Sequence, residues 1–310
     1  MKKWVLVAAG VLIAALVSVY VFIPAELNII QITPVKCTQQ GAYRHLATAD
    51  KWKKWWPAGG SEEDKLSYQQ GTYQLTKTLL NAVNVHIQHQ DLSVNSVLHV
   101  FPFPGDSAAV EWKCQLVAGS NPVKRIRYYQ QALTIKNNLA ALLASFKTFA
   151  EKKENIYGIK ISESFSIKDT ALIATKATTV AYPTVKDMYA SIQALQKFSW
   201  AHQAKQTGSP ILNITPSHPS GFEIMIALPV NKELPDTDPF FKKRILPARF
   251  LFSRVQGGQG AVEEAFAQLQ WYVLDYRKVL MTIPFQQLIT DRLAEPDSTK
   301  WVTDIYMPVF

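Results

Sequence analysis

Two short phrases decide the fold of this chain, "FEIMIALPV" at residues 222–230 and "WVTDIYMPV" at residues 301–309. Each phrase is an apolar run that ends in Pro-Val, and the two Pro-Val pairs lie 79 positions apart. Recurrence of one phrase at such a distance is typical of an internal repeat. The phrases therefore direct attention to the segments that precede them.

Those preceding segments follow one order. The first has an extended run at 170–180, a helical stretch, and a second extended run at 211–215; the second has an extended run at 248–256, a helical stretch, and an extended run at 285–290. Apolar residues at spacings of three and four mark each helix: Val185, Met188, Ile192 and Leu195, then Val262, Phe266, Leu269, Val273 and Tyr276. Neither copy could bury such a stripe alone. We therefore predict two strand-helix-strand-strand copies that pack about a pseudo-twofold axis into one core.

The region from residue 28 to residue 154 has a different pattern. It reads as a short strand, a Trp-rich stretch, several extended segments and a closing helix. "AAVEWKCQLV" at 108–117 and "VKRIRYYQQAL" at 123–133 are separated by "AGSNP", which predicts a hairpin. The closing helix carries one apolar stripe, consisting of Ile135, Leu139, Leu142, Phe146 and Phe149. A long helix of this kind after an antiparallel sheet predicts an α+β fold in which the sheet wraps onto the helix.

The N-terminus is strongly apolar. The run Trp4–Ile23 carries no charge and has about the length of a membrane-spanning helix. It is longer than the apolar region of a cleaved signal peptide, so we predict an uncut transmembrane anchor over residues 1–27. Lys2 and Lys3 favour a cytoplasmic N-terminus. These features predict a single-pass protein of the cytoplasmic (inner) membrane whose soluble domains are extracytoplasmic.

Composition limits the remaining classes. The chain is 48% apolar and 18% charged, which is typical of globular domains with buried cores. Its net charge of +9 is spread along the chain without a nucleic-acid-binding motif, so nucleic acid is not expected as a partner. The metal, P-loop and nucleophile-elbow motifs are absent, and we predict no catalytic residue, no cofactor and no metal. Cys37 and Cys114 either form a disulfide or remain two buried thiols.

The stretch "IIQITPVKCTQQGAYRHLATADKWKKWWP" at 29–57 resembles the start of the SRPBCC superfamily, which includes START-related and polyketide-cyclase proteins. The resemblance covers residues 28–154 and implies a helix-grip fold with an internal apolar cavity. In many members that cavity holds a lipid-like or aromatic ligand. Trp52, Trp55 and Trp56 therefore contact a ligand, pack in the core, or lie at the interface with the bilayer.

Residues 155–310 are similar to the GyrI-like effector-binding family, also found in AraC-type and MerR-type regulators. The resemblance is carried by "ILPARFLFSRVQGG", "AVEEAFAQLQWYVLDY", "IPFQQLITD" and "WVTDIYMPV". It implies a small-molecule cleft between the two copies, lined by aromatic residues and sometimes holding a buried carboxylate that attracts organic cations.

Two positions depart from the pattern of that family. Where the family often has Pro-Phe-Glu, this chain has Pro284-Phe285-Gln286. Where it often has Gly-Pro-Tyr before the second helix, this chain has Gly257-Gly258-Gln259. A carboxylate and an aromatic ring are thus missing at matching positions, which argues against a strong preference for lipophilic cations.

We expect a ligand pocket, if present, to involve Trp271, Tyr272, Phe285, Gln286 and Tyr306. Glu223 lies on the strand face opposite Phe222, so that it either faces the cleft or meets water. Several of these residues could instead belong to the core.

The predicted function is that of a membrane-anchored, non-catalytic protein that binds apolar or aromatic small molecules. Its predicted domains are an anchor (1–27), a helix-grip domain (28–154) and a GyrI-like domain (155–310), and the binding site lies in the second, the third or both. Two alternatives remain open: a cyclase- or hydrolase-type enzyme acting on a small hydrophobic compound, and an interaction protein whose cavities are filled by side chains.

Overall fold

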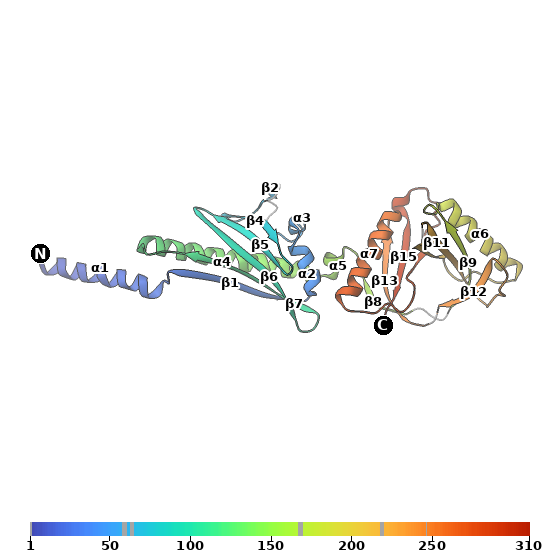
Figure 1. Ribbon diagram of the computed structural model, residues 1–310, viewed down its shortest axis with the longest axis horizontal. Helices are drawn as coiled ribbons and strands as arrows, with labels where there is room; N and C mark the ends of the chain where they lie inside the picture. Colours follow the sequence, from blue (N-terminus) through green and yellow to red (C-terminus); the bar gives the residue numbers. More distant parts are fainter. Residues whose placement is uncertain (1, 58–60, 63–64, 167–169, 218–219, 246) are drawn as a thin grey trace. The chain divides into compact units, whose positions relative to one another are not determined.

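The computed structural model describes residues 2–57, 61–62, 65–166, 170–217, 220–245 and 247–310. The chain has an α+β fold and forms two compact units, Met1–Ile156 and Tyr157–Phe310. Each unit is built on an antiparallel sheet (Figure 1).

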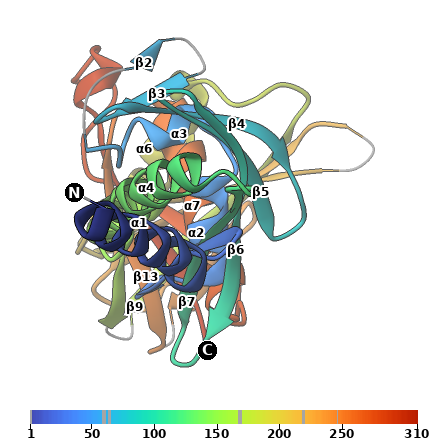
Figure 2. The ribbon, with the colours of Figure 1, turned by 90° about the vertical axis from the view of Figure 1, so that its left-hand side faces the viewer.

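The first unit combines its sheet with a long helix. Its elements after the N-terminal helix are β1 (Glu26–Val35), α2 (Gln39–Leu46), α3 (Ala49–Trp52), β2 (Ser61–Glu62), β3 (Lys65–Tyr68), β4 (Gly71–Thr78), β5 (Ala82–His89), β6 (Leu92–Phe103), β7 (Ser107–Val117), α4 (Pro122–Ala150) and α5 (Lys153–Tyr157). The strand order is β1-β7-β6-β5-β4-β3-β2, and Figure 2 shows β4 to β7 curving around α4. Ile135, Leu139, Leu142 and Phe146 of the predicted stripe are fully buried. A sheet that wraps onto a long helix is therefore confirmed, while membership of the SRPBCC superfamily stays a prediction.

The predicted hairpin at 108–133 is wrong in its second half. β7 forms as expected, but the segment 123–133 belongs to α4. Asn121 caps this helix, because its side-chain oxygen accepts hydrogen bonds from the backbone N–H groups of Val123 and Lys124. Pro122 occupies the first turn, where its missing N–H costs no helical hydrogen bond. The Asn-Pro pair thus starts a helix and does not reverse the chain between two strands.

The N-terminal residues form α1 (Lys2–Phe22). Its end packs against the start of α4. The Tyr20 hydroxyl donates to the carbonyl of Ser120, just before α4, at 2.6 Å, and the guanidinium of Arg125 on α4 lies 4.8 Å from the Tyr20 ring centre. Among the helices of the described residues, none combines the length and the apolar character that a membrane crossing requires. The predicted transmembrane anchor is therefore not supported, and the extracytoplasmic location stays a prediction.

His45 on α2 makes the first unit sensitive to pH. Its ring is buried, and Nε2 lies 3.0 Å from the Ile156 carbonyl oxygen, to which the neutral ring donates. Burial lowers the pKa of His45 from 6.5 to about 4, since a charged ring would lose its hydration. The unfolded chain therefore binds the proton more tightly than the folded one. The stability that His45 contributes is present above pH 6.5 and is lost as the pH falls towards 4.

We expect the free energy of unfolding of the first unit to drop by about 3 kcal/mol between pH 6.5 and pH 4 through this group. Urea unfolding at a series of pH values measures the slope. A His45→Gln variant, which cannot titrate in this range, should show a flatter profile. Equal slopes for the two proteins would contradict the assignment to His45.

The second unit contains the predicted duplication. Its elements are β8 (Ser162–Ser166), β9 (Thr170–Thr179), α6 (Val185–Ala201), β10 (Ile211–Pro216), β11 (Phe222–Val230), β12 (Phe240–Ile245), β13 (Arg249–Gln256), α7 (Gln259–Asp275), β14 (Phe285–Leu288), the 3-10 helix η1 (Ser298–Lys300) and β15 (Val302–Pro308). The first copy is β9-α6-β10-β11 and the second is β13-α7-β14-β15. The phrases "FEIMIALPV" and "WVTDIYMPV" form the last strand of each copy, as predicted.

Two further strands join the copies by exchange. β8 precedes the first copy along the chain but pairs with β13 of the second, whereas β12 precedes the second copy but pairs with β9 of the first. The copies also meet directly where β10 pairs with β14. The strand order β12-β9-β11-β10-β14-β15-β13-β8 is consequently symmetric about its centre. One continuous sheet results.

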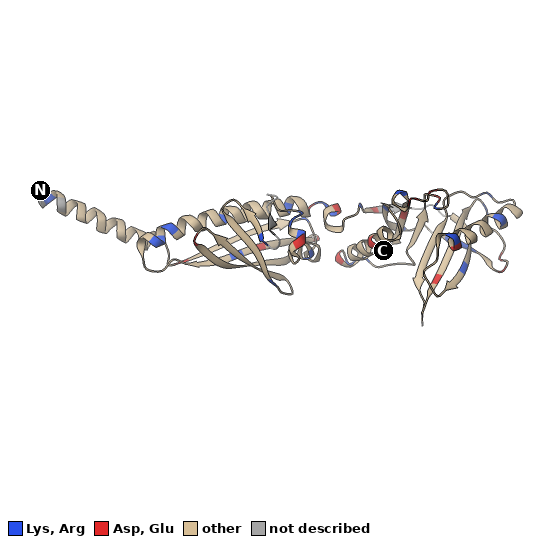
Figure 3. Cartoon of the chain, turned by 90° about the horizontal axis from the view of Figure 1, so that it is seen from above, with Lys and Arg blue, Asp and Glu red and all other residues tan. Residues whose placement is uncertain are grey.

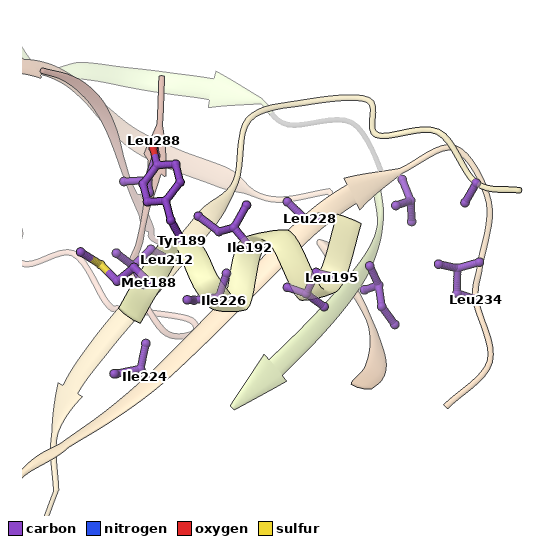
Figure 4. Packing of buried hydrophobic residues seen from close by; sticks show 13 residues of the cluster. Met188, Tyr189, Ile192, Leu195, Leu212, Ile224, Ile226, Leu228, Leu234 and Leu288 are labelled. Atoms are coloured by element: carbon purple, nitrogen blue, oxygen red, sulfur yellow. The ribbon is translucent and has the colours of Figure 1, made fainter. Parts of the chain in front are cut away.

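The shared core lies beneath α6. Its buried residues come from α6 and from the strands of both copies, because Leu288 of β14 joins the side chains of α6, β10 and β11 (Figure 4). Burying one such side chain contributes roughly 1.5–3 kcal/mol. The second copy thus contributes Leu288 to the core beneath α6, while the statement that neither copy buries its helix stripe alone stays a prediction.

Candidate functional site

Alternate residues of the sheet in the second unit face opposite sides. Ile173, Leu212 and Leu288 pack towards α6, while Leu172 and Ile211 belong to a separate cluster on the other side. We call the side that carries the helices the helix face and the other side the open face. Both faces are hollowed.

A groove lies between α7 and β10 on the helix face. Its volume is about 430 Å³, within the range of about 300–1,000 Å³ that is typical of small-molecule sites. We call it the α7 groove. The aromatic and polar side chains that line it and could contact a ligand are those of Tyr182, Phe222, Phe266, Gln259, Glu263 and Gln286.

Aromatic rings form the apolar part of the α7 groove. Tyr182 and Phe222 contact each other edge to face, with ring centres 5.3 Å apart at 75°, and Phe266 adds a third ring from α7. Burial raises the pKa of Tyr182 to about 12, and the nearby Glu263 carboxylate acts in the same direction. The Tyr182 hydroxyl therefore stays protonated at neutral pH and can donate a hydrogen bond.

Gln286 supplies a buried polar group to the same groove. Its side chain is 3% exposed, and its Oε1 has no hydrogen-bond partner among the described residues. A buried acceptor without a donor costs roughly 1–3 kcal/mol. A half-turn of the amide exchanges oxygen and nitrogen, so the group can accept from a ligand or donate to one.

Both departures from the GyrI-like pattern meet in the α7 groove. Gln259 and Gln286 line it, although they lie 27 positions apart in the sequence. The Gln259 amide donates to the Glu263 carboxylate at 3.1 Å, at the exposed side of the helix. Where the resemblance implies an aromatic ring and a carboxylate, this chain has two neutral amides.

The repeat places a second groove beside α6. Its volume is about 450 Å³, and its α6 wall consists of Tyr189, Ile192, Gln193 and Gln196. The α7 groove has Glu263, Phe266, Ala267 and Gln270 at positions 74 residues later. The α6 groove is the more polar of the two, because Gln206 and Asp291 also line it. We therefore regard the α7 groove as the better small-molecule site.

The predicted pocket residues lie on both faces of the sheet. Gln286 lines the α7 groove, whereas Phe285 and Tyr306 are on the open face, with ring centres 5.0 Å apart and stacked at 23°. The Tyr306 hydroxyl donates to Gln287 Oε1 at 3.2 Å, and burial raises the pKa of Tyr306 to about 12. The structure does not bring these residues into one pocket.

The remaining predicted residues of this unit lie elsewhere. Trp271 is on α7 and is 46% exposed, while Tyr272 is fully buried and stacks on Tyr276 with ring centres 4.4 Å apart. Glu223 is partly exposed on the open face and binds Lys176 at 2.6 Å. The Glu223 side chain thus takes part in an ion pair that is partly open to solvent, and its role in ligand binding stays a prediction.

The tryptophans of the first unit form an aromatic cluster. Trp52, Trp55 and Trp56 are all buried and contact one another with ring centres 5.2 to 5.6 Å apart. Trp112 joins them, 6.0 Å from Trp52. The sequence left three roles open for these tryptophans: ligand contact, core packing and the bilayer interface. The structure places all three side chains in the core, and contact with a ligand stays a prediction.

Other expectations concern charge and cysteine chemistry. Lys and Arg are spread over both units (Figure 3). Cys37 and Cys114 are buried and form no disulfide, and burial raises the pKa of the Cys114 thiol to about 11. Within the described ranges, no three His, Cys, Asp or Glu side chains gather in a way that could hold a metal ion.

Sequence reasoning missed Tyr182, Phe222 and Phe266 as one aromatic group. Tyr182 lies between β9 and α6, Phe222 begins β11, and Phe266 comes from α7 of the second copy. Phe266 belongs to the predicted apolar stripe of the helix, but such a stripe does not show which of its residues lie in the core and which line a groove. The sequence did offer one signal for this groove: Gln259 and Gln286 are the two positions at which the chain departs from the GyrI-like pattern.

No family model and no curated protein matches the chain. Similar solved structures include the EcmrR–DNA complex, with 15% identity, a TM-score of 0.44 and coverage of 62% of this chain and 72% of that chain. A hydrolase from Listeria innocua has 9% identity and a TM-score of 0.37, covering 49% of this chain and 91% of that chain. SAV2435 bound to tetraphenylphosphonium has 15% identity and a TM-score of 0.32, covering 49% and 93%. At these identities and TM-scores, none of them assigns the chain to a family.

Proposed function

We propose that the second unit is a non-catalytic receptor that binds a small aromatic molecule in the α7 groove. The observation that carries the proposal is the combination of three aromatic rings with a buried amide whose oxygen has no partner, in one groove of suitable volume. Apolar walls with a few convergent polar groups are the general form of small-molecule sites. The resemblance to GyrI-like effector-binding domains supports the same class of function.

The chemistry of the groove favours a neutral ligand with a hydrogen-bond donor. Gln286 offers an acceptor, and the carboxylate that would stabilise a buried organic cation is replaced by this amide. The Glu263 carboxylate lies at the exposed side of α7 and already accepts from Gln259. An exposed carboxylate attracts a cation only weakly.

The test is a fluorescence titration of the full chain with N-phenyl-1-naphthylamine, a neutral aromatic amine whose emission rises in apolar sites. We expect saturable binding that is unaffected by moderate salt. A linear rise without saturation would contradict the proposal. Chemical conversion of a bound probe would contradict its non-catalytic part and favour the enzyme alternative.

Gln286→Leu tests the role of the buried amide. The variant keeps the bulk of the side chain but removes the acceptor, so binding of the aromatic amine should weaken about tenfold, equal to about 1.4 kcal/mol. Binding of 1-benzylnaphthalene, which has a similar shape and no N–H, should not weaken. Equal losses for both probes would show that the amide acts through packing alone.

A further inference from the structure

The open face of the second unit carries a separate pocket of about 400 Å³. Leu172, Ile211, Ala227, Phe250 and Phe285 provide apolar walls from both copies. These apolar residues alternate with those that face the helices, so they lie on the opposite side of the sheet from the α7 groove, although Asn213 and Pro284 line both hollows. We call it the open-face pocket.

A difference between the two copies creates this hollow. In the first copy Ala174 pairs with Ala227, whereas at the equivalent positions of the second copy Phe252 pairs with Tyr306. Two methyl groups in the first copy thus correspond to two aromatic rings in the second. Ala227 lines the pocket, so the space that the Tyr306 ring fills in the second copy stays open above Ala227.

Aromatic rings close the pocket on the side of the second copy. Phe250 and Phe285 line it, with ring centres 6.0 Å apart in an edge-to-face contact, and Tyr306 stacks behind Phe285. Each of these rings therefore contacts an aromatic neighbour. Such a wall suits a flat apolar body.

The charges around the pocket are positive. Lys243 of β12 pairs with Leu172 of β9, which places both side chains on the open face, and both residues line the pocket. The carboxylates of that face already have cationic partners: Glu223 binds Lys176 at 2.6 Å, and Asp304 binds Arg254 at 2.7 Å. In the part of the chain that the structure describes, no carboxylate pairs with the Lys243 ammonium.

We propose that the open-face pocket binds an organic anion, with a flat apolar body against Phe250 and Phe285 and one carboxylate or sulfonate beside Lys243. The second cationic residue at the pocket, Arg244, is paired with Glu233 at 3.3 Å, which leaves Lys243 to meet the ligand charge. The described lining contains no carboxylate, so an organic cation would gain no partner and would be repelled by Lys243.

Isothermal titration calorimetry of the full chain with three naphthalene compounds tests this charge preference. The compounds are 1-naphthaleneacetate, its neutral amide, and 1-naphthylmethylammonium. We expect the anion to bind about tenfold more tightly than the amide, and the ammonium compound to bind more weakly than both. Ala227→Phe places a ring in the hollow, as Tyr306 does in the second copy, and should remove this anion binding.

Lys243→Gln should abolish the preference for the anion, and Lys243→Glu should reverse it. Lys242→Gln is the matched control, because Lys242 pairs with Ile173 and therefore faces the other side of the same strand. It should leave the preference unchanged. The proposal is overturned if the anion binds no better than the amide, if Lys242→Gln and Lys243→Gln act alike, or if binding survives Ala227→Phe.

Discussion

Ala267→Phe is expected to abolish binding of N-phenyl-1-naphthylamine, with a loss of at least about 100-fold, equal to about 2.7 kcal/mol. Ala267 lies on the α7 wall of the groove. A phenylalanine at this position would occupy the space that the ligand needs. Fluorescence titration of the variant measures the loss.

The fold should tolerate this substitution. Gln193 occupies the equivalent position on α6, 74 residues earlier, and there a longer side chain lines the corresponding groove. Far-UV circular dichroism and the midpoint of thermal unfolding should therefore stay close to those of the unchanged chain.

Ala227→Phe is the matched control for Ala267→Phe. The substitution is chemically the same, but it lies on the open face of the sheet. Binding of the neutral amine should be retained in this variant. If Ala227→Phe abolished binding of the amine and Ala267→Phe did not, the proposed site would be on the wrong face.

Trp112→Ala is expected to produce the largest loss of stability, about 3–5 kcal/mol in the free energy of unfolding of the first unit. Trp112 is fully buried and lies edge to face against Trp52 and Tyr73, at 6.0 and 5.9 Å between ring centres. Its indole N–H donates to Ser96 Oγ at 2.9 Å. The substitution removes these contacts and leaves a cavity in a core that cannot collapse fully.

Urea unfolding followed by circular dichroism measures this loss. Phe103→Ala serves as the control, because Phe103 lies in the same unit and is 52% exposed, so its removal should change the free energy of unfolding by less than about 0.5 kcal/mol. A loss below about 1.5 kcal/mol for Trp112→Ala would show that the aromatic cluster packs loosely. That result would favour an internal cavity in the first unit.

The duplication could be predicted because it repeats a pattern along the chain. Leu195 and Leu269 lie 74 positions apart, and both are fully buried on the equivalent helices α6 and α7. Helical spacing and a recurring last strand were sufficient to find the two copies. The pairing of β8 with the second copy and of β12 with the first could not be predicted, since the sequence of a short edge strand does not determine its pairing partner.

The hairpin prediction failed for a local reason. Residues 123–133 include Val123, Ile126, Tyr128 and Tyr129, which suit a strand, but Asn121 and Pro122 favour a helix start. The capping hydrogen bonds and packing against β1 and β7 decided the outcome. If the Asn121-Pro122 pair is interpreted as a helix start, the predicted helix extends back to Pro122, where α4 begins.

The candidate sites were harder to predict than the fold. The residues Phe285 and Gln286 were both identified, yet they are neighbours on one strand and therefore face opposite sides. Trp271 and Tyr272 were chosen for their chemistry, but the turn of α7 directs one to solvent and the other into the core. The contrast between Ala227 and Tyr306 was visible in the two repeated phrases and would have located the open-face pocket.

The most direct test of the central claim is a crystal structure of the chain with N-phenyl-1-naphthylamine. The ligand should lie between α7 and β10, with its rings against Tyr182 and Phe266 and its N–H within hydrogen-bond distance of the Gln286 side chain. Two results would contradict a receptor site beneath α7. One is ligand density on the open face, and the other is an empty groove, closed by Phe266, at a saturating concentration of the amine.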